Sequence, residues 1–358
     1  MNSTQTAIIL AKQFGLSDAL QASISPIGNG HINSTLLLKT PKHALVLQQL
    51  NNQVFPSLTS LVKNARLIEQ HLSAKKAIGN YNLNIIRHII SCDENYLVEH
   101  NGGTWRALGL IEHTYSEDVV NNAEQAYTAA NAFGQFAAAL ADFDAQQLHA
   151  VIPDFHNLAM RAQQFKNVVN SNAFNRVAQC QAEIDFCFEQ FNLITELEAI
   201  EASLPVRVCH NDTKINNMLF CNHTDNASAV IDLDTCMSGY WLYDFGDMVR
   251  TFCSPEQEDS LNLTKVKIRE DIFLALAKGY LAPLKGIITP QEKHSFWVGT
   301  KVMTFMIGLR FLTDYLDGDS YFSVKHKQHN LQRAQNQFAL YRDILAKQNT
   351  LQALLSQL

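Results

Sequence analysis

Short apolar runs of strand length alternate with turn residues along the first 113 positions. The runs lie at 24–27, 34–39, 44–48, 95–99 and 105–111, and Gly, Asn and Pro separate them. Gly102-Gly103 before the last run is typical of a hairpin turn. The stretch 58–72 differs, because its apolar residues recur with a period of about 3.6. The pattern predicts a small, largely antiparallel sheet with one helix beside it.

After about residue 120 the apolar period becomes helical. The segments with this period are 125–143, 182–201, 266–281 and 290–315. One β-rich insert interrupts them, with short apolar runs at 206–209, 218–221 and 229–234. We therefore expect an α+β protein with a small sheet lobe at 1–113 and a larger, mainly helical lobe at 114–358, divided near His113 to Asp118.

Charge and composition remove several classes of function. The 358 residues include 28 Lys+Arg and 34 Asp+Glu, a net charge of −6, so no basic surplus exists for binding nucleic acid. The most apolar late stretch contains Lys301 and Arg310, which leaves it short of the roughly 18–20 residues of a membrane span. The first residues lack a basic segment typical of a secretory signal. We expect a cytoplasmic protein with no membrane or nucleic-acid partner.

The densest cluster of Asp, Asn and His lies in the β-rich insert. Asp212 follows a short strand, Asn217 comes five residues later, and Asp232 ends the next hairpin. Phosphoryl transfer needs a carboxylate that orients the attacking hydroxyl and hard oxygen ligands for Mg²⁺. The alternative is that these residues only form turns, where Asp and Asn are common. Asp232 and Asp234 are two positions apart on a predicted strand and would therefore lie on the same face. Two neighbouring carboxylates repel each other, and this repulsion favours a bound cation.

Three segments of this cluster carry a resemblance to a known family. The segments HNDTKINNMLF, VIDLDT and YWLYDFGDMVR resemble the aminoglycoside phosphotransferase and choline kinase superfamily, whose fold is that of the protein kinases. More narrowly, GNGHINST, LVLQQLNNQVF and LRFLTDYLDGDSYF resemble the N-acetylhexosamine 1-kinase group. The resemblance implies a two-lobed protein-kinase-like fold, with ATP and Mg²⁺ bound between the lobes.

The resemblance also assigns roles to residues. It makes Asp212 the catalytic base and Asn217 and Asp232 the metal ligands, with Asp234 as a weaker candidate for metal or substrate. The nucleotide loop would contain Gly28, Gly30 and Asn33, although the third glycine of the usual pattern is absent. For Asp244, in a DFG-like triplet, we favour a role as a brace of the catalytic loop over a role as a metal ligand.

The chain departs from the kinase pattern on the strand after this loop. Where kinase strands supply a phosphate-binding Lys, this chain has Gln48. Lys39 and Lys42 lie nearby, in a predicted hairpin turn. Glu69 occupies the position of the usual partner of that Lys. What replaces the Lys is left open by the sequence, and a nucleotide-binding pseudokinase scaffold therefore remains an alternative function.

The acceptor site is predicted near the C-terminus. Arg310 and Tyr321 could bind sugar hydroxyls and an N-acetyl group, while Arg310 and Asp314 could instead form an ion pair along one helix face. The resemblance favours transfer to the anomeric hydroxyl of GlcNAc or GalNAc. A choline or aminoglycoside kinase is the alternative within the same superfamily. The sequence does not indicate an oligomeric state.

Overall fold

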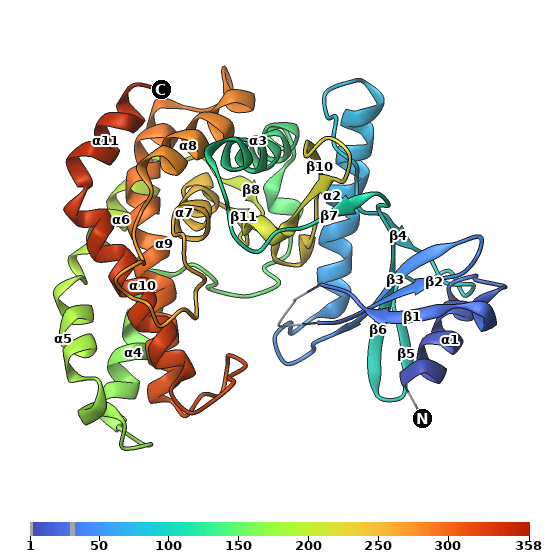
Figure 1. Ribbon diagram of the computed structural model, residues 1–358, viewed down its shortest axis with the longest axis horizontal. Coiled ribbons are helices and arrows are strands. Elements are labelled where there is room, and N and C mark those ends of the chain that lie inside the picture. The colour runs from blue at the N-terminus through green and yellow to red at the C-terminus, as the bar shows by residue number, and fades with distance from the viewer. Residues whose placement is uncertain (1–2, 29–32) are drawn as a thin grey trace.

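The computed structural model describes residues 3–28 and 33–358, with the backbone alone at 3 and 4. A β-rich part and a larger helical part lie side by side in Figure 1. The β-rich part is an antiparallel sheet of order β1-β2-β3-β6-β4, with β5 paired to β6. Its strands are β1 (Ser23–Pro26), β2 (Ser34–Lys39), β3 (Ala44–Leu50), β4 (His88–Ile89), β5 (Val98–His100) and β6 (Gly103–Gly109). This arrangement confirms the predicted small antiparallel sheet.

Helix α1 (Ser3–Gln13) covers one face of the sheet. Its Leu10 and the following Phe14 belong to the same buried cluster as Leu45 and Leu47 of β3. The alternation of side chains along β3 places these two leucines on one face. The sequence pattern did not predict this helix, because its stability comes from packing on the sheet more than from its own period.

Helix α2 (Leu58–Ala77) connects the sheet to the helical part. Ser57 caps it by accepting a hydrogen bond from the backbone N–H of Ser60, 3.2 Å away. Its buried residues Ile68 and Leu72 belong to the large core of the helical part. Figure 1 shows α2 standing between the two parts.

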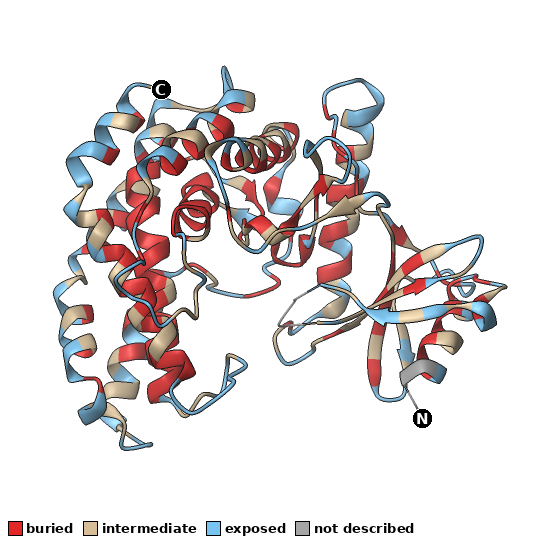
Figure 2. Cartoon of the chain, in the orientation of Figure 1, coloured by how far each residue is buried: buried red, intermediate tan, exposed pale blue. Residues whose placement is uncertain are grey.

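The helical part is organised around α7 (Trp241–Phe252) and α9 (Pro290–Leu316). These two helices pack so closely that a Cβ at Gly246 or at Gly299 would collide with a backbone carbonyl oxygen of the other helix. A capping box of Thr289 and Glu292, with Pro290 at the first position, starts α9. Figure 2 shows buried residues concentrated along these helices. The helices are α3 (Ala123–Ala139), α4 (Leu158–Ser171), α5 (Gln181–Glu189), α6 (Asn192–Glu201), α7 (Trp241–Phe252), α8 (Glu270–Leu284), α9 (Pro290–Leu316), α10 (His329–Ala346) and α11 (Gln348–Ser356).

Two small sheets contain the four strands of the insert between α6 and α7, together with β7, which precedes α3. Their strands are β7 (Thr114–Tyr115), β8 (Arg207–Cys209), β9 (Met218–Cys221), β10 (Ala227–Val230) and β11 (Met237–Gly239), in the orders β10-β9-β7 and β11-β8. Because β7 pairs with β9, the chain joins the helical part soon after β6 ends. The division of the chain into two lobes, at residues 1–113 and 114–358, stays a prediction. None of the helices in the described ranges is both long and apolar enough to cross a bilayer.

Two element predictions were wrong in detail. The segment 182–201, predicted as one helix, breaks between Glu189 and Asn192 into α5 and α6. The segment 229–234, predicted as a strand, leaves β10 after Val230 and turns through Asp232, which has left-handed backbone angles (φ 60°, ψ 66°). A periodicity argument detects neither a short break in a helical face nor a residue with positive φ.

Candidate active site

A buried carboxylate of α7 holds the loop that follows β8. Asp244 accepts hydrogen bonds from the backbone N–H groups of His210 (2.9 Å) and Asn211 (2.7 Å), and Thr213 Oγ1 donates to its carbonyl oxygen. These contacts fix a loop in which Asn211 has a positive φ of 64°. Asp244 therefore braces the loop, in line with the role favoured by the sequence.

His210 lies behind this loop as a packed, neutral side chain. Its ring makes edge contacts with Phe133 and Phe136, and Nε2 lies 2.9 Å from the carbonyl oxygen of Ile231. Burial lowers the pKa of His210, so the ring is uncharged near neutral pH. Its contacts connect the loop to the end of β10.

Asp212 lies on the braced loop as an ionised carboxylate. Asn217 Nδ2 donates to Asp212 Oδ2 at 2.8 Å, and Lys214 Nζ lies 3.3 Å from Oδ1. Burial opposes ionisation, but the positive charge of Lys214 and the hydrogen bond from Asn217 outweigh it, so the pKa of Asp212 is below its usual value. The sequence thus correctly placed Asp212 beside Asn217, and the carboxylate can accept a hydrogen bond or a proton.

Asp232 faces two other carboxylates. Burial and the neighbouring Asp234 and Asp212 raise the pKa of Asp232 to about 7, while Arg106 opposes the shift. The carboxylates converge because the backbone turns at Asp232, and not because the two residues share one face of a strand, as the sequence had suggested. A crowded carboxylate of this kind is stabilised by a nearby cation.

The oxygen atoms of Asn217 and Asp232 fit a Mg²⁺ ion that is shared with nucleotide phosphates. Mg²⁺ in such sites takes one or two protein oxygens and completes its shell with phosphates and water. Within the described ranges, no group of three or more His, Cys, Asp or Glu side chains could hold a metal ion. The assignment of Asn217 and Asp232 as metal ligands stays a prediction.

Asp234 is bound by protein side chains. Its carboxylate pairs with Arg106 through Nη1 at 2.6 Å and Nη2 at 2.9 Å, and it accepts a hydrogen bond from Asn33 Nδ2 at 2.8 Å. The role of metal or substrate ligand that the sequence suggested for Asp234 stays a prediction. Arg106 was missed, although an Arg within the apolar strand segment WRALG was a visible signal.

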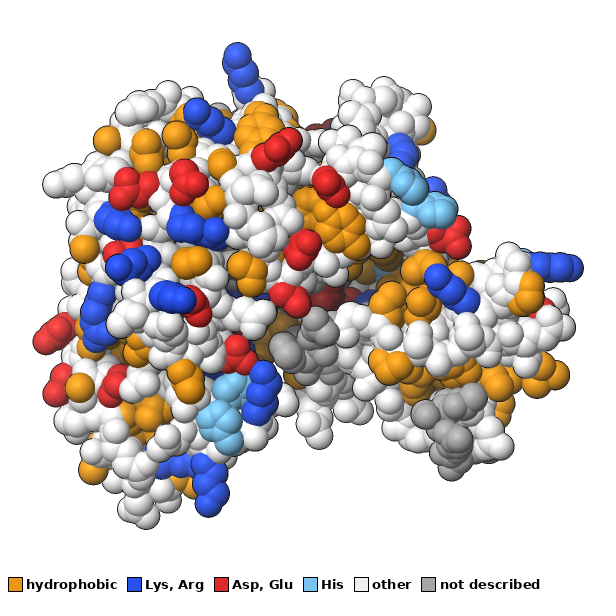
Figure 3. Space-filling view, in the orientation of Figure 1, with side chains coloured by type: hydrophobic (Ala, Val, Ile, Leu, Met, Phe, Trp, Pro, Cys, Tyr) orange, Lys and Arg blue, Asp and Glu red, His pale blue; other side chains and the backbone are white. Residues whose placement is uncertain are grey.

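A cavity of about 640 Å³ lies at this cluster. It is lined by Gln48 and Arg106 of the sheet, by Asn217 and Asp232, and by the segment 108–116. The hollow between the two parts of the molecule is visible in Figure 3. Its position agrees with the expected nucleotide site near His113 to Asp118.

The predicted nucleotide loop is placed in part. Gly28 lines the cavity and has a positive φ of 77°, which favours glycine. Gly30 lies outside the described residues. Asn33 Oδ1 accepts a hydrogen bond from the backbone N–H of Asn51 at 3.0 Å, while its amide nitrogen binds Asp234. Asn33 thus connects this end of the loop to the carboxylate cluster.

Two residues of the kinase pattern have other partners in this chain. Glu69 binds Arg66 at 2.5 Å and accepts hydrogen bonds from the backbone and the ring of His88. It is thus the partner of a histidine on β4, while Gln48 binds Arg106. Lys42 lies in the hairpin between β2 and β3, as predicted, but the prediction was wrong for Lys39, which ends β2 opposite Ala44 and lines the cavity.

Arg310 and Tyr321 lie together, as the acceptor prediction requires. The hydroxyl of Tyr321 lies 3.4 Å from Arg310 Nη2, and the guanidinium carbon lies 5.1 Å from the ring centroid of Phe155. Asp314 accepts the backbone N–H groups of Tyr321 and Phe322 at 2.7 and 2.9 Å. The role of Asp314 is therefore to hold the loop that carries Tyr321, in place of the predicted ion pair along the helix.

His156 lies within electrostatic range of both this region and the catalytic loop, and no sequence pattern predicted its position. Burial, followed by Arg310 and Arg161, lowers the pKa of His156 to about 3, while Asp212 has the opposite effect. Arg310 and Asp212 therefore both lie within electrostatic range of one buried imidazole. Arg161 of α4 points toward the same segment, with Nη2 3.3 Å from the carbonyl oxygen of Asp154.

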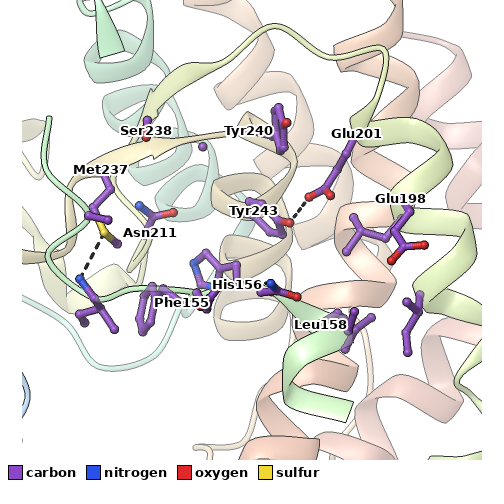
Figure 4. Close-up of a pocket in the computed structure, with 18 residues that line it drawn as sticks. Phe155, His156, Leu158, Glu198, Glu201, Asn211, Met237, Ser238, Tyr240 and Tyr243 are labelled. Atoms are coloured by element: carbon purple, nitrogen blue, oxygen red, sulfur yellow. Dashed lines mark hydrogen bonds between the residues drawn. The ribbon is translucent and has the colours of Figure 1, made fainter. Parts of the chain in front are cut away.

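A second cavity, of about 430 Å³, adjoins the catalytic loop and is drawn in Figure 4. Asn211 lines one side, and His156 stacks on Tyr243 with the ring centroids 4.9 Å apart. The hydroxyl of Tyr243 donates to Glu201. These contacts pack the loop at 150–159 against the start of α7, beside the residue that precedes Asp212.

Solved structures share this architecture at low sequence identity. An aminopropanol kinase associated with a microcompartment is 13% identical, with a TM-score of 0.60, over 96% of this chain and 98% of the other. An aminoglycoside phosphotransferase from Alicyclobacillus acidocaldarius is 14% identical, with a TM-score of 0.58, over 97% and 96%. A choline kinase from Cryptosporidium parvum is 15% identical, with a TM-score of 0.54, over 97% of both chains. They confirm the predicted two-lobed, kinase-like α+β fold.

A sequence-family comparison is more specific than these likenesses of fold. The profile described as the Phosphotransferase enzyme family matches residues 23–269, which is more than half of the chain. The match contains Asp212, Asn217, Asp232 and Asp244. The narrower resemblance to N-acetylhexosamine 1-kinases stays a prediction. The chain belongs to the Phosphotransferase enzyme family.

Proposed function

We propose that this protein transfers the γ-phosphoryl group of ATP to the anomeric hydroxyl of an N-acetylhexosamine, GlcNAc or GalNAc. The observation that carries the proposal is the ionised carboxylate of Asp212, held by Asn217, which lines a cavity together with Asp232. A positioned base, oxygen ligands and room for a nucleotide are the parts that phosphoryl transfer requires.

Each residue of the cluster has a distinct part in this reaction. Asp212 orients the acceptor hydroxyl and takes its proton as the bond to phosphorus forms. Asn217 and Asp232 would hold Mg²⁺. When bound, this ion offsets the negative charge of the phosphates. Asp244 keeps Asp212 in place through two hydrogen bonds to the backbone of the preceding residues.

Charge at the acceptor end favours a neutral sugar over a cationic acceptor. Arg310 is buried, and burial together with the neighbouring Arg161 lowers its pKa to about 10, so it remains charged near neutral pH. Choline and aminopropanol carry positively charged nitrogen, which two arginines would repel. The guanidinium and the ring of Tyr321 can instead bind hydroxyl and carbonyl oxygens and contact the apolar face of a sugar.

The anomeric hydroxyl suits a carboxylate with a lowered pKa. This hydroxyl is more acidic than an ordinary sugar alcohol, so a weak base that orients it can take the proton late in the transfer. Positioning and charge stabilisation would then supply most of the reduction in barrier. Asp212 has this character, since Lys214 and Asn217 stabilise its charged form.

The test measures acceptor-dependent ADP release with ATP and Mg²⁺, followed by a reducing-end assay of the product. We expect turnover with GlcNAc or GalNAc and a product that no longer reduces. Asp212→Asn is the inactive variant, and Asp271→Asn, an exposed carboxylate on α8, is its matched control. A product that still reduces would contradict transfer to the anomeric position.

Other outcomes favour the alternatives. Turnover of choline or an aminoglycoside, with no activity on hexosamines, would assign the chain to that branch of the superfamily. Nucleotide binding without any acceptor turnover would favour a pseudokinase scaffold, the alternative raised by Gln48.

A further inference from the structure

The position of the missing lysine is occupied by a pair of residues from two strands. Gln48 of β3 lies directly opposite Arg106 of β6 in the antiparallel register. Arg106 is only 3% exposed, and both side chains line the 640 Å³ cavity. A buried guanidinium therefore lies beside the place where the kinase pattern puts an ammonium group.

The guanidinium is held in a fixed orientation. Nε and Nη2 donate to Gln48 Oε1 at 2.9 and 2.7 Å, and Nη2 and Nη1 bind the two carboxylate oxygens of Asp234. Three of the five N–H groups of Arg106 donate hydrogen bonds in these contacts. Nη1 makes only the ion pair with Asp234 and donates no hydrogen bond to a residue that the structure describes.

Gln48 is suited to this arrangement in a way that lysine is not. Its Nε2 donates to Thr35 Oγ1 at 3.1 Å, which turns Oε1 toward Arg106. A lysine at this position would have no acceptor atom for the guanidinium and would place a second positive charge beside it. Gln48 therefore holds the guanidinium of Arg106, on the neighbouring strand β6, in its orientation.

We propose that Arg106 is the phosphate-binding cation of the nucleotide cavity, displaced from β3 to β6, and that Gln48 and Asp234 are its positioning residues. A guanidinium binds phosphate oxygens through directed hydrogen bonds as well as charge. Asn33 of the predicted nucleotide loop binds the same Asp234 carboxylate, so the loop and the cation share one anchor. The inference rests on the proposed use of ATP.

The alternative is that Arg106 only neutralises Asp234 in the interior. The two roles differ in what they do to ligands with and without phosphate. A phosphate-binding Arg106 affects ATP and ADP but leaves adenosine binding unchanged, and its replacement has the same selective effect in an Asp234→Asn background, whereas an Arg106 that only neutralises Asp234 has no effect in that background. Calorimetric binding of ADP, ATP and adenosine, with Mg²⁺ and without acceptor, separates the roles.

We expect Arg106→Gln to weaken ADP and ATP binding about 10- to 100-fold, the effect of losing hydrogen bonds to a charged group, with adenosine binding unchanged. Arg87→Gln, an exposed residue of the same part, is the control for the loss of one positive charge. The double variant Gln48→Lys/Arg106→Gln returns a cation to β3, and we expect it to recover part of the lost ADP affinity. If Arg106→Gln does not fold, Arg106→Lys tests the same point, with a selective loss of ADP affinity.

Equal ADP affinity in wild type and in Arg106→Gln would overturn the inference, while leaving the proposed phosphoryl transfer intact. A parallel loss of adenosine affinity would also overturn it, because the effect would then be structural. Failure of the wild-type protein to bind ATP or ADP would overturn both this inference and the proposed function. The two failures are therefore distinguishable in one series of titrations.

Discussion

His156 is a buried imidazole that cannot be protonated without a cost to the folded state. It is 8% exposed, and its ring packs against the rings of Phe155 and Tyr243. Burial, with Arg310 and Arg161, lowers its pKa from 6.5 to about 3. In the unfolded chain the same side chain binds a proton near pH 6.5.

The difference between the pKa of His156 in the folded and the unfolded chain determines the sign and the size of its effect on stability. A base whose pKa is lowered by folding contributes full stability above pH 6.5 and loses it as the pH falls toward 3, since only the unfolded state gains the proton. The loss is about 1.4 kcal/mol per pH unit, so His156 alone lowers the free energy of unfolding by about 2 kcal/mol between pH 7.5 and pH 5. His210, also buried with a lowered pKa, adds to this loss.

His156→Phe removes the titration and keeps an aromatic ring against Tyr243. Urea denaturation at pH 7.5 and pH 5 gives the free energy of unfolding of both proteins. We expect the pH-induced loss to be about 2 kcal/mol smaller in the variant, and unchanged in His294→Phe, a control at an exposed histidine. An equal loss in wild type and His156→Phe would refute the assignment of a neutral, buried His156.

The remaining predictions concern catalysis. Asp212→Asn is expected to lower kcat by about 10² to 10⁴ while ADP binding in a titration stays within about two-fold, as for a positioned base; near-normal turnover would exclude that role. Asp232→Ala is expected to abolish activity and the dependence on Mg²⁺ together, and an unchanged Mg²⁺ profile in steady-state kinetics would place the metal elsewhere. Arg310→Ala and Tyr321→Phe are expected to raise the acceptor KM more than the ATP KM, and equal effects on both would indicate a packing role.

The proximity of Asp212 and Asn217 was predictable because the chemistry proposed for them requires these residue types at a short separation. Asp212 and Asn217 are five residues apart, and the structure joins their side chains at 2.8 Å. Asp244 could be interpreted as a brace because Asp232 already occupied the metal position, and its two hydrogen bonds to the loop agree with that role. The order and spacing of these residues along the chain were enough to predict both arrangements.

Interactions between residues that only the tertiary structure brings together were not predictable in the same way. Arg161, on α4, and Arg310, on α9, are far apart in the sequence, and both act on His156 from its surroundings in the folded chain. The turn at Asp232 depends on a positive φ that alternation along a strand does not detect. The proximity of Arg161 and Arg310, on which the proposal of a neutral acceptor depends, therefore becomes visible only in three dimensions.

Position 48 shows the difference most clearly. Along the sequence, Gln48 is a lysine lost from a kinase strand, and that loss raised the possibility of a pseudokinase. In the sheet, the register pairs Gln48 with Arg106, and the guanidinium reaches Asp234, 128 residues further along the chain. A positive charge therefore remains at the cavity, supplied by another strand. Whether a departure from a family pattern removes a function or moves it to a neighbouring strand depends on the register of the sheet, which a single sequence does not contain.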